Sequence, residues 1–478
     1  MTPAKQLSSV QVQTDAQGRL VLRTNNPSKT AQPVNARLPE VTGQELGDLF
    51  FPITPEAFTA AYWGRQPLFV KGSVEKLERL IPGGFGREDF FRVARETTEK
   101  GLVNFKLQAG YYQGIITDDE ATPRPFVPIT PDQMEPMFAA GANLMADYLH
   151  EPRLAKLVAA LKTQLQHAGT IDFLLTLSPQ SNGWRPHLDR TSVIAVQLEG
   201  TKRYVISPGP VQAWPRGTAT IGTDGQVTSY EYDAEAYDEI PPVEMSSLYE
   251  VVLEPGDLLY LPSGTIHSTA ATTGHTLNLN LLFAQANFTD LLSRVLNTRL
   301  VSDPNWRHLP PIKLADQQAG VLPNEARDFF AARLTEAQAA LRELTSDAYE
   351  LNQHWHKMIA DPGEAHLTSL AFSTTREPIT TSSVQPTDRL RLARRAPMTM
   401  ACGTDSDGDP CVTLYYANRE VSAAAEWTLF LQTLTQQTEF TAQTATTWSH
   451  TEEAYPWPMV QEYLQALREQ GFIEQVTA

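Results

Sequence analysis

Two side chains that can bind a metal ion lie one residue apart near the middle of the sequence. His187 offers a ring nitrogen and Asp189 offers a carboxylate oxygen. On a β-strand, residues i and i+2 point to the same face, so both groups can reach one ion. His267, which follows the segment Gly256–Ile266, is the candidate for a third ligand. Two histidines and one carboxylate are the facial ligand set of mononuclear iron sites that keep coordination positions open.

The spacing of histidine and acid is not specific by itself, because an isolated His-x-Asp also fits a surface turn. His450 precedes Glu452 by the same two positions, in polar and threonine-rich surroundings. After Asp189, by contrast, the apolar run Ser192–Gly200 ends in a glycine and is followed by Tyr204–Ile206. This pattern predicts a β-hairpin and favours the metal-binding interpretation.

Several further segments have the composition of short β-strands. Together with the hairpin, these paired strands predict a mainly β core of the double-stranded β-helix, or jelly-roll, type. Helices are expected around it at 54–64, 74–100, 131–150 and 152–167. The additional strands are expected at Asp172–Ser178, Tyr249–Leu253, Leu258–Pro262 and His275–Phe283.

Composition limits the classes of protein that the chain can belong to. With 478 residues it is long enough for two to four domains, and its net charge of −17 disfavours nonspecific nucleic-acid binding. Cys402 and Cys411 are expected to be unpaired thiols of a reducing compartment. An apolar run of about 18 residues and a signal-peptide pattern are both absent, so a cytoplasmic location is expected.

A long acidic insert, residues 209–248, separates the hairpin from the strand that leads to His267. Neither Lys nor Arg occurs between Gly217 and Glu250. Charge runs of this kind are usually solvated loops. The alternative is an acidic lip that attracts a basic substrate, and both interpretations stay open.

The second half of the chain predicts helices at 287–301 and 323–358. The stretch Ala326–Leu344 is amphipathic and fits either packing on the barrel or pairing with a second subunit. Residues Thr374–Pro386 have the composition of a linker. The segment after it has the size and element order of a winged-helix-like α/β module.

Taken together, these features resemble the JmjC/cupin family of Fe(II)- and 2-oxoglutarate-dependent oxygenases, and more closely its ribosomal-oxygenase group of the cupin-4 type. The resemblance covers about residues 39–478. It is carried by the segments Tyr62–Leu68, Pro186–Asp189, Val196–Tyr204 and Glu254–Pro262, and by His267.

The chain is expected to have four parts. The resemblance implies three of these, a JmjC/cupin catalytic domain (39–300), a helical dimerisation region (301–375) and a winged-helix-like C-terminal domain (376–478). The fourth, a flexible arm (1–38), is expected from its composition, which is rich in Gln, Thr, Asn, Ser and Pro. The basic cluster Arg389, Arg391, Arg394 and Arg395 precedes the helices of that last domain, so DNA binding is not expected.

The resemblance also assigns roles to single residues. His187, Asp189 and His267 match the iron ligands, and Lys202 matches the residue that pairs with the distal carboxylate of 2-oxoglutarate. A buried lysine needs an anion, which agrees with that role. Without the resemblance, Lys202 fits a solvated turn beside Arg203 equally well.

Three polar residues are further candidates for contact with 2-oxoglutarate. Asn278 and Asn280 share one face of their strand, opposite Leu279, and Thr176 points inward by position. The alternative for both asparagines is a lining or edge position in the barrel. Members of the family often carry an acid where this chain has Ser192, so details of substrate binding are expected to differ.

The function implied by the resemblance is that of a 2-oxoglutarate-dependent dioxygenase using Fe(II), 2-oxoglutarate and O2. It would hydroxylate a side chain of a protein substrate, an Arg or a His of a basic ribosomal protein, as a homodimer. One alternative is a hydroxylase of a peptide or small natural product. Another is a non-catalytic, metal-binding interaction protein.

Overall fold

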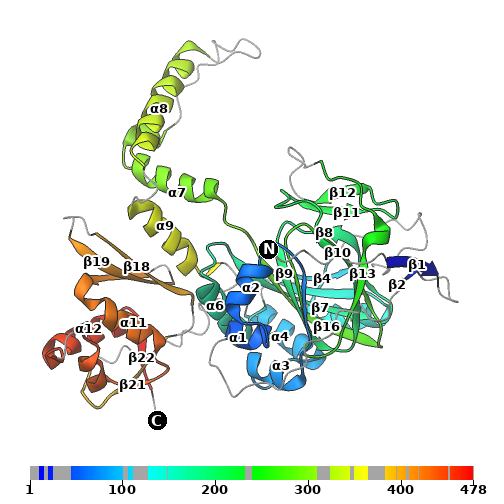
Figure 1. Cartoon of the computed structure of the whole chain (residues 1–478), viewed down its shortest axis with the longest axis horizontal. Coiled ribbons are helices and arrows are strands. Elements are labelled where there is room, and N and C mark those ends of the chain that lie inside the picture. Colours follow the sequence, from blue (N-terminus) through cyan, green and yellow to red (C-terminus); the bar gives the residue numbers. More distant parts are fainter. Residues whose placement is uncertain are drawn as a thin grey trace, which may run out of the picture. The chain divides into compact units, whose positions relative to one another are not determined.

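The computed structural model in Figure 1 divides the chain into two compact units, one built mostly from residues before 286 and the other from those after 285. The residues that the structure describes are 10–14, 20–24, 45–100, 106–110, 127–147, 149–231, 239–308, 323–344, 349–363, 383–393, 396–404, 409–417, 419–450 and 453–476. No helix among them is long and apolar enough to cross a lipid bilayer.

The first unit contains two large antiparallel sheets. The eight-stranded sheet has the order β3-β14-β9-β16-β7-β6-β4-β5, and the six-stranded sheet has the order β12-β11-β8-β15-β10-β13. In the first sheet these strands are β3 (Leu68–Val70), β14 (Leu258–Leu261), β9 (Ser192–Glu199), β16 (His275–Phe283), β7 (Ile171–Pro179), β6 (Asn143–Asp147), β4 (Lys106–Gly110) and β5 (Val127–Pro128). In the second they are β12 (Val227–Glu231), β11 (Thr218–Ile221), β8 (Gly183–Leu188), β15 (Thr265–Ala271), β10 (Lys202–Pro210) and β13 (Tyr249–Leu253).

Chain connections alternate between the two sheets, as in a jelly roll: β7 leads to β8, β9 to β10, β13 to β14 and β15 to β16. One buried apolar cluster takes residues from both sheets, including Ala195 and Leu261 from one and Tyr204 and Ile206 from the other. The sheets therefore face each other around a common interior, which confirms the predicted jelly-roll core. The predicted hairpin is wrong, because β9 and β10 lie in different sheets and do not pair with each other.

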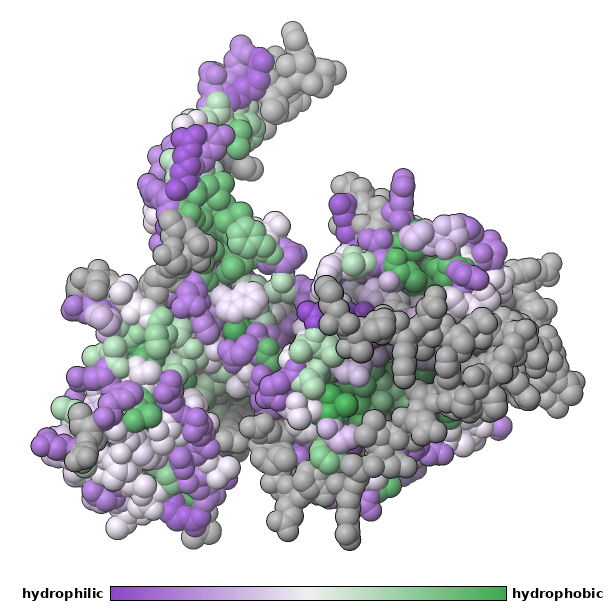
Figure 2. All heavy atoms as spheres, viewed as in Figure 1, coloured by the Kyte–Doolittle hydropathy of each residue, from purple (hydrophilic) through white to green (hydrophobic). Residues whose placement is uncertain are grey.

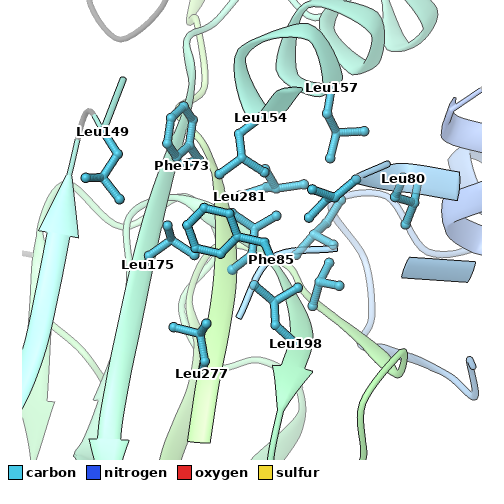
Figure 3. Packing of buried hydrophobic residues seen from close by; sticks show 14 of the residues in the cluster. Leu80, Phe85, Leu149, Leu154, Leu157, Phe173, Leu175, Leu198, Leu277 and Leu281 are labelled. Atoms are coloured by element: carbon cyan, nitrogen blue, oxygen red, sulfur yellow. The ribbon is translucent and has the colours of Figure 1, made fainter. Parts of the chain in front are cut away.

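The opposite face of the eight-stranded sheet forms a second, larger core under helices. It contacts α1 (Glu45–Phe50), α3 (Val74–Leu80), α4 (Arg87–Glu99) and α6 (Pro152–Leu165). Figure 3 shows leucines and phenylalanines of the strands and helices meeting there, among them Leu80, Phe85, Leu149, Leu154, Leu157, Phe173, Leu175, Leu198, Leu277 and Leu281. This layer holds the strands that carry part of the functional site.

Local signals of the sequence explain the helices that cover this sheet. In α2 (Pro55–Ala61), the hydroxyl of the N-cap Thr54 accepts a hydrogen bond from Ala57 N–H, and Pro55 takes the first helical position. The predicted helical segment 74–100 is present as α3 and α4, with a break around Pro82. These predictions are confirmed.

The predicted helix at 131–150 is wrong over its second half. Helix α5 (Met134–Ala139) ends at Gly141, whose φ of +90° suits glycine at a helix C-terminus. The chain then enters β6, where Leu144 and Ala146 join the core while Met145 and Asp147 are less buried. The glycine and this period of two were the signals for a strand.

Much of the acidic insert is ordered structure rather than a solvated loop. It contributes β11 and β12, and β11 extends the sheet next to β8. Ala219, Ile221, Val243 and Leu248 are buried there with Leu188. Residues 232–238 of the insert lie outside the described residues, so its predicted role as an acidic lip is not tested there.

The N-terminal arm is described only at β1 (Val10–Thr14) and β2 (Leu20–Thr24), which pair as an antiparallel ribbon. The arm, expected to be flexible, therefore contains a β-ribbon at these positions. The other residues before Glu45 lie outside the described part of the chain.

The second unit begins with three helices, α7 (Phe288–Leu300), α8 (Asn324–Arg342) and α9 (Tyr349–Ala360). Arg299 of α7 ties them together, because its guanidinium donates to the Ala340 carbonyl of α8 at 3.0 Å and to the Glu350 carboxylate of α9. Helices at 287–301 and 323–358 are thereby confirmed. The assignment of this region to dimerisation stays a prediction.

In the described residues, the rest of the second unit combines two three-stranded sheets with the α-helices α11 (Thr428–Gln436) and α12 (Trp457–Glu469). The strands are β17 (Arg389–Leu392), β21 (Phe440–Thr441) and β22 (Ile473–Gln475), and then β18 (Met398–Thr404), β19 (Pro410–Tyr416) and β20 (Arg419–Ala424). Both helices lie where the sequence predicts them. The winged-helix assignment and the four domain boundaries stay predictions.

Two smaller expectations concern this unit. Cys402, which is exposed, and Cys411, which is buried, are free thiols, as predicted. In the basic cluster, Arg389 pairs with Glu439, and Arg391 pairs with Glu474 at 2.7 Å. Arg394 and Arg395 lie outside the described residues.

Candidate metal centre

The three predicted metal ligands meet inside the jelly roll. His187 of β8 and His267 of β15 are direct cross-strand partners, and Asp189 follows β8 by one residue. One ligand atom from each of the three lies within 4.8 Å of the other two. The antiparallel pairing of β8 with β15 therefore brings together residues that are 78 to 80 positions apart in sequence.

The ligand atoms converge on one side of the pair. Oδ2 of Asp189 lies 3.8 Å from Nε2 of His187 and 3.6 Å from Nε2 of His267. Each imidazole directs its Nδ1 to a carbonyl two residues earlier in the chain, of Arg185 at 2.7 Å and of Thr265 at 3.1 Å. A carbonyl only accepts, so Nδ1 carries the proton and Nε2 keeps its lone pair for a metal.

Burial keeps the His267 ring neutral. The pKa of His267 is lowered to about 4, mainly because the ring is removed from water and to a smaller extent because His187 lies next to it. Neutral imidazole is the form that binds a metal ion, so this environment prepares the ligand at neutral pH. Donor set, tautomers and protonation all fit a divalent transition metal.

Lys202, the predicted anchor for 2-oxoglutarate, is 1% exposed at the start of β10. It shares the inward face of β10 with Tyr204 and Ile206, and Ile206 is paired with His267. Within the described part of the chain no acidic group pairs with its ammonium, and burial lowers its pKa to about 7. An unpaired buried amine in a barrel that holds metal ligands fits a site for an anionic co-substrate.

Asn280, Asn278 and Thr176 lie on neighbouring strands. Asn278 is the cross-strand partner of Thr176, and Asn280 donates to the Thr176 hydroxyl at 3.4 Å. Leu279 belongs to the outer core, whereas Leu282, on the same face as both asparagines, packs on the interior cluster. The predicted shared face is confirmed, and contact with a co-substrate stays a prediction.

The side chain of Asn278 is already engaged within the protein. It donates to Oε1 of Gln197 at 2.6 Å, and Gln197 in turn donates to the carbonyls of Glu199 and Gly200. This network fixes the turn that precedes Lys202. Asn278 therefore has a close hydrogen-bond partner within the protein. Asn280 makes longer contacts, at 3.4 Å, with the Thr176 hydroxyl and the Leu174 carbonyl.

Two other residues singled out in the sequence have structural roles. His450 accepts a hydrogen bond from Leu429 N–H near the start of α11, at 3.3 Å and on the surface. Ser192 is fully buried, and its hydroxyl accepts a hydrogen bond from Ser263 N–H at 3.1 Å. Ser192 thus stabilises the loops beside Asp189.

Sequence reasoning missed two residues that hold Asp189 in place. Thr218, on β11 of the acidic insert, donates its hydroxyl to Oδ1 of Asp189 at 3.1 Å. Gly264 donates its N–H to the Asp189 carbonyl at 2.8 Å. Gly264 has a φ of +79°, and a Cβ there would lie 1.8 Å from the Gln212 carbonyl oxygen, so only glycine fits. The motif Pro262-Ser263-Gly264 carried a signal for this turn, but nothing local linked Thr218 to the site.

Fold and site together define a double-stranded β-helix with a His-Asp-His ligand set. Residues 144–291 match the family model described as a JmjC domain, and this range includes all three ligands and Lys202. This part of the chain thus matches a JmjC domain, in agreement with the motifs of the sequence. Domain and ligand set agree with the expected class of 2-oxoglutarate-dependent oxygenases and with Fe(II), 2-oxoglutarate and O2.

Similar proteins lie in both bacteria and animals. The chain is 27% identical over 278 residues to the uncharacterized protein YxbC of Bacillus subtilis, covering 56% of this chain and 79% of that protein. It is 26% identical over 252 residues to human ribosomal oxygenase 1, covering 52% of this chain and 36% of that protein. The chain thus spans most of the bacterial relative but about a third of the human one.

Among solved structures, one match is Escherichia coli ribosomal oxygenase YcfD. The comparison gives 15% identity and a TM-score of 0.49, and it covers 88% of this chain and 98% of YcfD.

Proposed function

We propose that the protein is an Fe(II)- and 2-oxoglutarate-dependent oxygenase that hydroxylates a side chain of a protein substrate. The observation that carries the proposal is the joint presence, in one barrel, of three convergent ligands and a buried lysine that has no acidic partner among the described residues. A structural metal site would need no such cation. A dicarboxylate co-substrate does, because its second carboxylate must be neutralised once it leaves water.

In this proposal His187 and His267 hold the iron through Nε2 and Asp189 holds it through Oδ2. Bound iron supplies the chemistry that couples oxidative decarboxylation of 2-oxoglutarate to insertion of one oxygen atom into a C–H bond. Lys202 receives the distal carboxylate. On β15, the partner of Lys202 is Ala271, four residues beyond His267, which is about 13 Å along the strand. A five-carbon diacid and a lysine side chain together can bridge this gap.

Asn280 and Thr176 complete the proposed binding surface. Their contact is long, at 3.4 Å, and Asn280 lies on the inward face of β16. Both side chains can exchange this weak contact for a hydrogen bond to a carboxylate oxygen of the co-substrate. Asn278 is a weaker member of the set because Gln197 already binds its amide.

The proposed substrate is an Arg or His side chain of a basic ribosomal protein. The sequence motifs resemble those of ribosomal oxygenases, and about half the chain is similar to a protein of that name. The net charge of −17 favours approach of a basic partner. A hydroxylase of a peptide or a small natural product would share the metal centre and is the main alternative.

The enzyme activity is tested by succinate formation from 2-oxoglutarate with Fe(II), in the presence of a panel of peptides from basic ribosomal proteins. Wild type is expected to form succinate, and His267→Ala and Lys202→Met are expected to form none. Absence of iron-dependent succinate from the wild type with every peptide would support the third possibility, a non-catalytic metal-binding protein.

The substrate is identified by intact-mass analysis of ribosomal proteins from cells with and without the gene. One protein is expected to lose about 16 Da, the mass of one oxygen atom, when the gene is deleted. An unchanged ribosomal set, together with active succinate formation on another compound, would favour the peptide or natural-product alternative.

We further propose that the protein forms a homodimer through its helical region. Figure 2 shows apolar side chains gathered along these helices. Phe288 of α7 and Leu334 of α8 are 67% and 63% exposed, and along α8, which the structure describes completely, only Ala326 is buried. Such an apolar surface favours association.

Light scattering after size-exclusion chromatography tests the dimer. Leu334→Glu is expected to give a monomer, whereas the matched control Val74→Glu, on α3 and 66% exposed, is expected to stay dimeric. A wild type that runs as a monomer would contradict the proposal. The cytoplasmic location also stays a prediction.

A further inference from the structure

The acidic insert reaches the metal centre through one hydroxyl group. The two carboxylate oxygens of Asp189 are occupied differently: Oδ2 lies 3.8 and 3.6 Å from the imidazole Nε2 atoms, whereas Oδ1 accepts a hydrogen bond from the Thr218 hydroxyl at 3.1 Å. One oxygen thus faces the ligand atoms, and a donor holds the other.

The position of Thr218 is set by the sheet rather than by a loose loop. On the ladder between β11 and β8, Thr220 pairs with His187 and Ala219 pairs with Leu188, so Thr218 is the next position opposite Asp189. Ala219 and Leu188 are both fully buried in the cluster beneath the insert. A β-branched side chain on a strand also has few rotamers, which limits where its hydroxyl can point.

We propose that Thr218 is a positioning residue that presents Asp189 to the metal through Oδ2 alone. Carboxylates bind metals through one or two oxygens, and a hydrogen bond on the second oxygen favours binding through one. Each oxygen kept off the metal leaves a coordination position for co-substrate or dioxygen. The inference rests on the metal centre of the proposed function and gives the insert a role distinct from both a solvated loop and an acidic lip.

The test is a titration of the metal-free full chain with Co(II), followed by visible absorption, in Thr218→Val, Thr218→Ser and Thr228→Val. Valine keeps the shape of threonine and removes the donor. Loss of such a supporting hydrogen bond is expected to weaken Co(II) binding about 10- to 100-fold and to change the absorption band. Serine keeps the hydroxyl and is expected to restore both to near wild type.

Thr228→Val is the matched control, because Thr228 lies on the neighbouring strand β12 and its exposed hydroxyl donates to the Thr220 carbonyl instead. Co(II) affinity and spectrum are expected to stay at wild-type values. Equal behaviour of Thr218→Val and Thr228→Val would overturn the inference, as would failure of serine to rescue. Should Thr218→Val not fold, Thr218→Ala is judged by the same two readouts.

These readouts do not depend on turnover. A wild type that binds Co(II) but forms no succinate, with Thr218→Val still weakened, would refute the proposed activity and leave the role of Thr218 standing. If the wild type forms succinate and Thr218→Val binds Co(II) like the wild type, the proposed activity stands and the proposed role of Thr218 is refuted.

Discussion

The two faces of β16 bury different kinds of side chain. Leu277, Leu279, Leu281 and Phe283 point to the outer core beneath the helices, and all are fully buried. On the alternate face, Asn278 and Asn280 point toward the interior that also holds Lys202. The outer face therefore stabilises the fold through burial of apolar side chains. Burial of the polar groups on the inner face costs free energy, but it places them where a co-substrate can bind.

The polar groups of the interior differ from the outer core in the same way, although the interior also contains the apolar cluster around Tyr204. Side chains on the outer face are interchangeable in principle, because hydrophobic residues of similar volume satisfy the core. The inner groups are not, since each depends on one partner: His187 on the Arg185 carbonyl, and His267 on that of Thr265. Substitutions on the outer face should thus change stability, and those on the inner face should change binding and activity.

The largest effect is expected at the metal centre. His187→Ala removes one of three ligands and is expected to abolish iron-dependent succinate formation while the melting temperature changes little. His450→Ala is the matched control, because this histidine also precedes an acid by two positions but lies at the surface near α11. Wild-type turnover in His187→Ala would contradict the role of His187 as a ligand, and with it the distinction between the inner and outer faces.

On the outer face, Leu279→Ala is expected to lower the free energy of unfolding by about 2–5 kcal/mol, as large-to-small changes in a core do. Leu279 is fully buried, so the lost side chain leaves a cavity. Urea denaturation measures the change, and Val74→Ala at an exposed position serves as the control. Folded Leu279→Ala should keep its turnover number, and loss of activity without loss of stability would contradict the division.

The pH dependence of the free energy of unfolding tests whether the interior destabilises the charged form of Lys202. Burial lowers its pKa to about 7 in the folded protein, from 10.5 in the exposed state. Between these values the unfolded chain binds the extra proton, so stability rises with pH through this window, by at most about 1.4 kcal/mol per pH unit.

Lys202→Met is expected to lack this rise and to be more stable than wild type near pH 7, because no buried amine remains. Urea denaturation at several pH values between 7 and 10, without 2-oxoglutarate, measures both slopes. Equal slopes of stability against pH in wild type and Lys202→Met would contradict the prediction. They would show that the folded protein keeps Lys202 protonated in this pH range and that its pKa is not lowered.

The smallest effect is expected at Asn280. Loss of one neutral hydrogen bond costs about 0.5–1.5 kcal/mol, so Asn280→Ala should raise the KM for 2-oxoglutarate roughly three- to tenfold. Steady-state succinate kinetics measure it, with Asn278→Ala as the comparison because its amide is engaged by Gln197. An unchanged KM in Asn280→Ala would remove this residue from the proposed binding surface.

How far sequence reasoning reached depended on the range of the interactions. The i and i+2 spacing of His187 and Asp189 and the alternation around Leu279 are local, and both predictions are confirmed. The helix predicted through 131–150 was wrong in its second half because Gly141 ends it, a local signal that was overlooked, and the residues that follow pair with β4 and β7 as strand β6.

Some facts about this protein follow from the sequence alone. The ligand types, their spacing on strands, the acidic balance and the motifs of a JmjC domain are properties of neighbouring residues and of composition.

The tertiary structure decided the rest. It paired His187 with His267, buried Lys202 where the described residues offer no acidic partner, and placed β11 of the insert alongside β8 so that Thr218 reaches Asp189. These contacts join residues tens of positions apart through the register of antiparallel strands. That register is set by burial on both faces of the sheets, which no local stretch of sequence specifies.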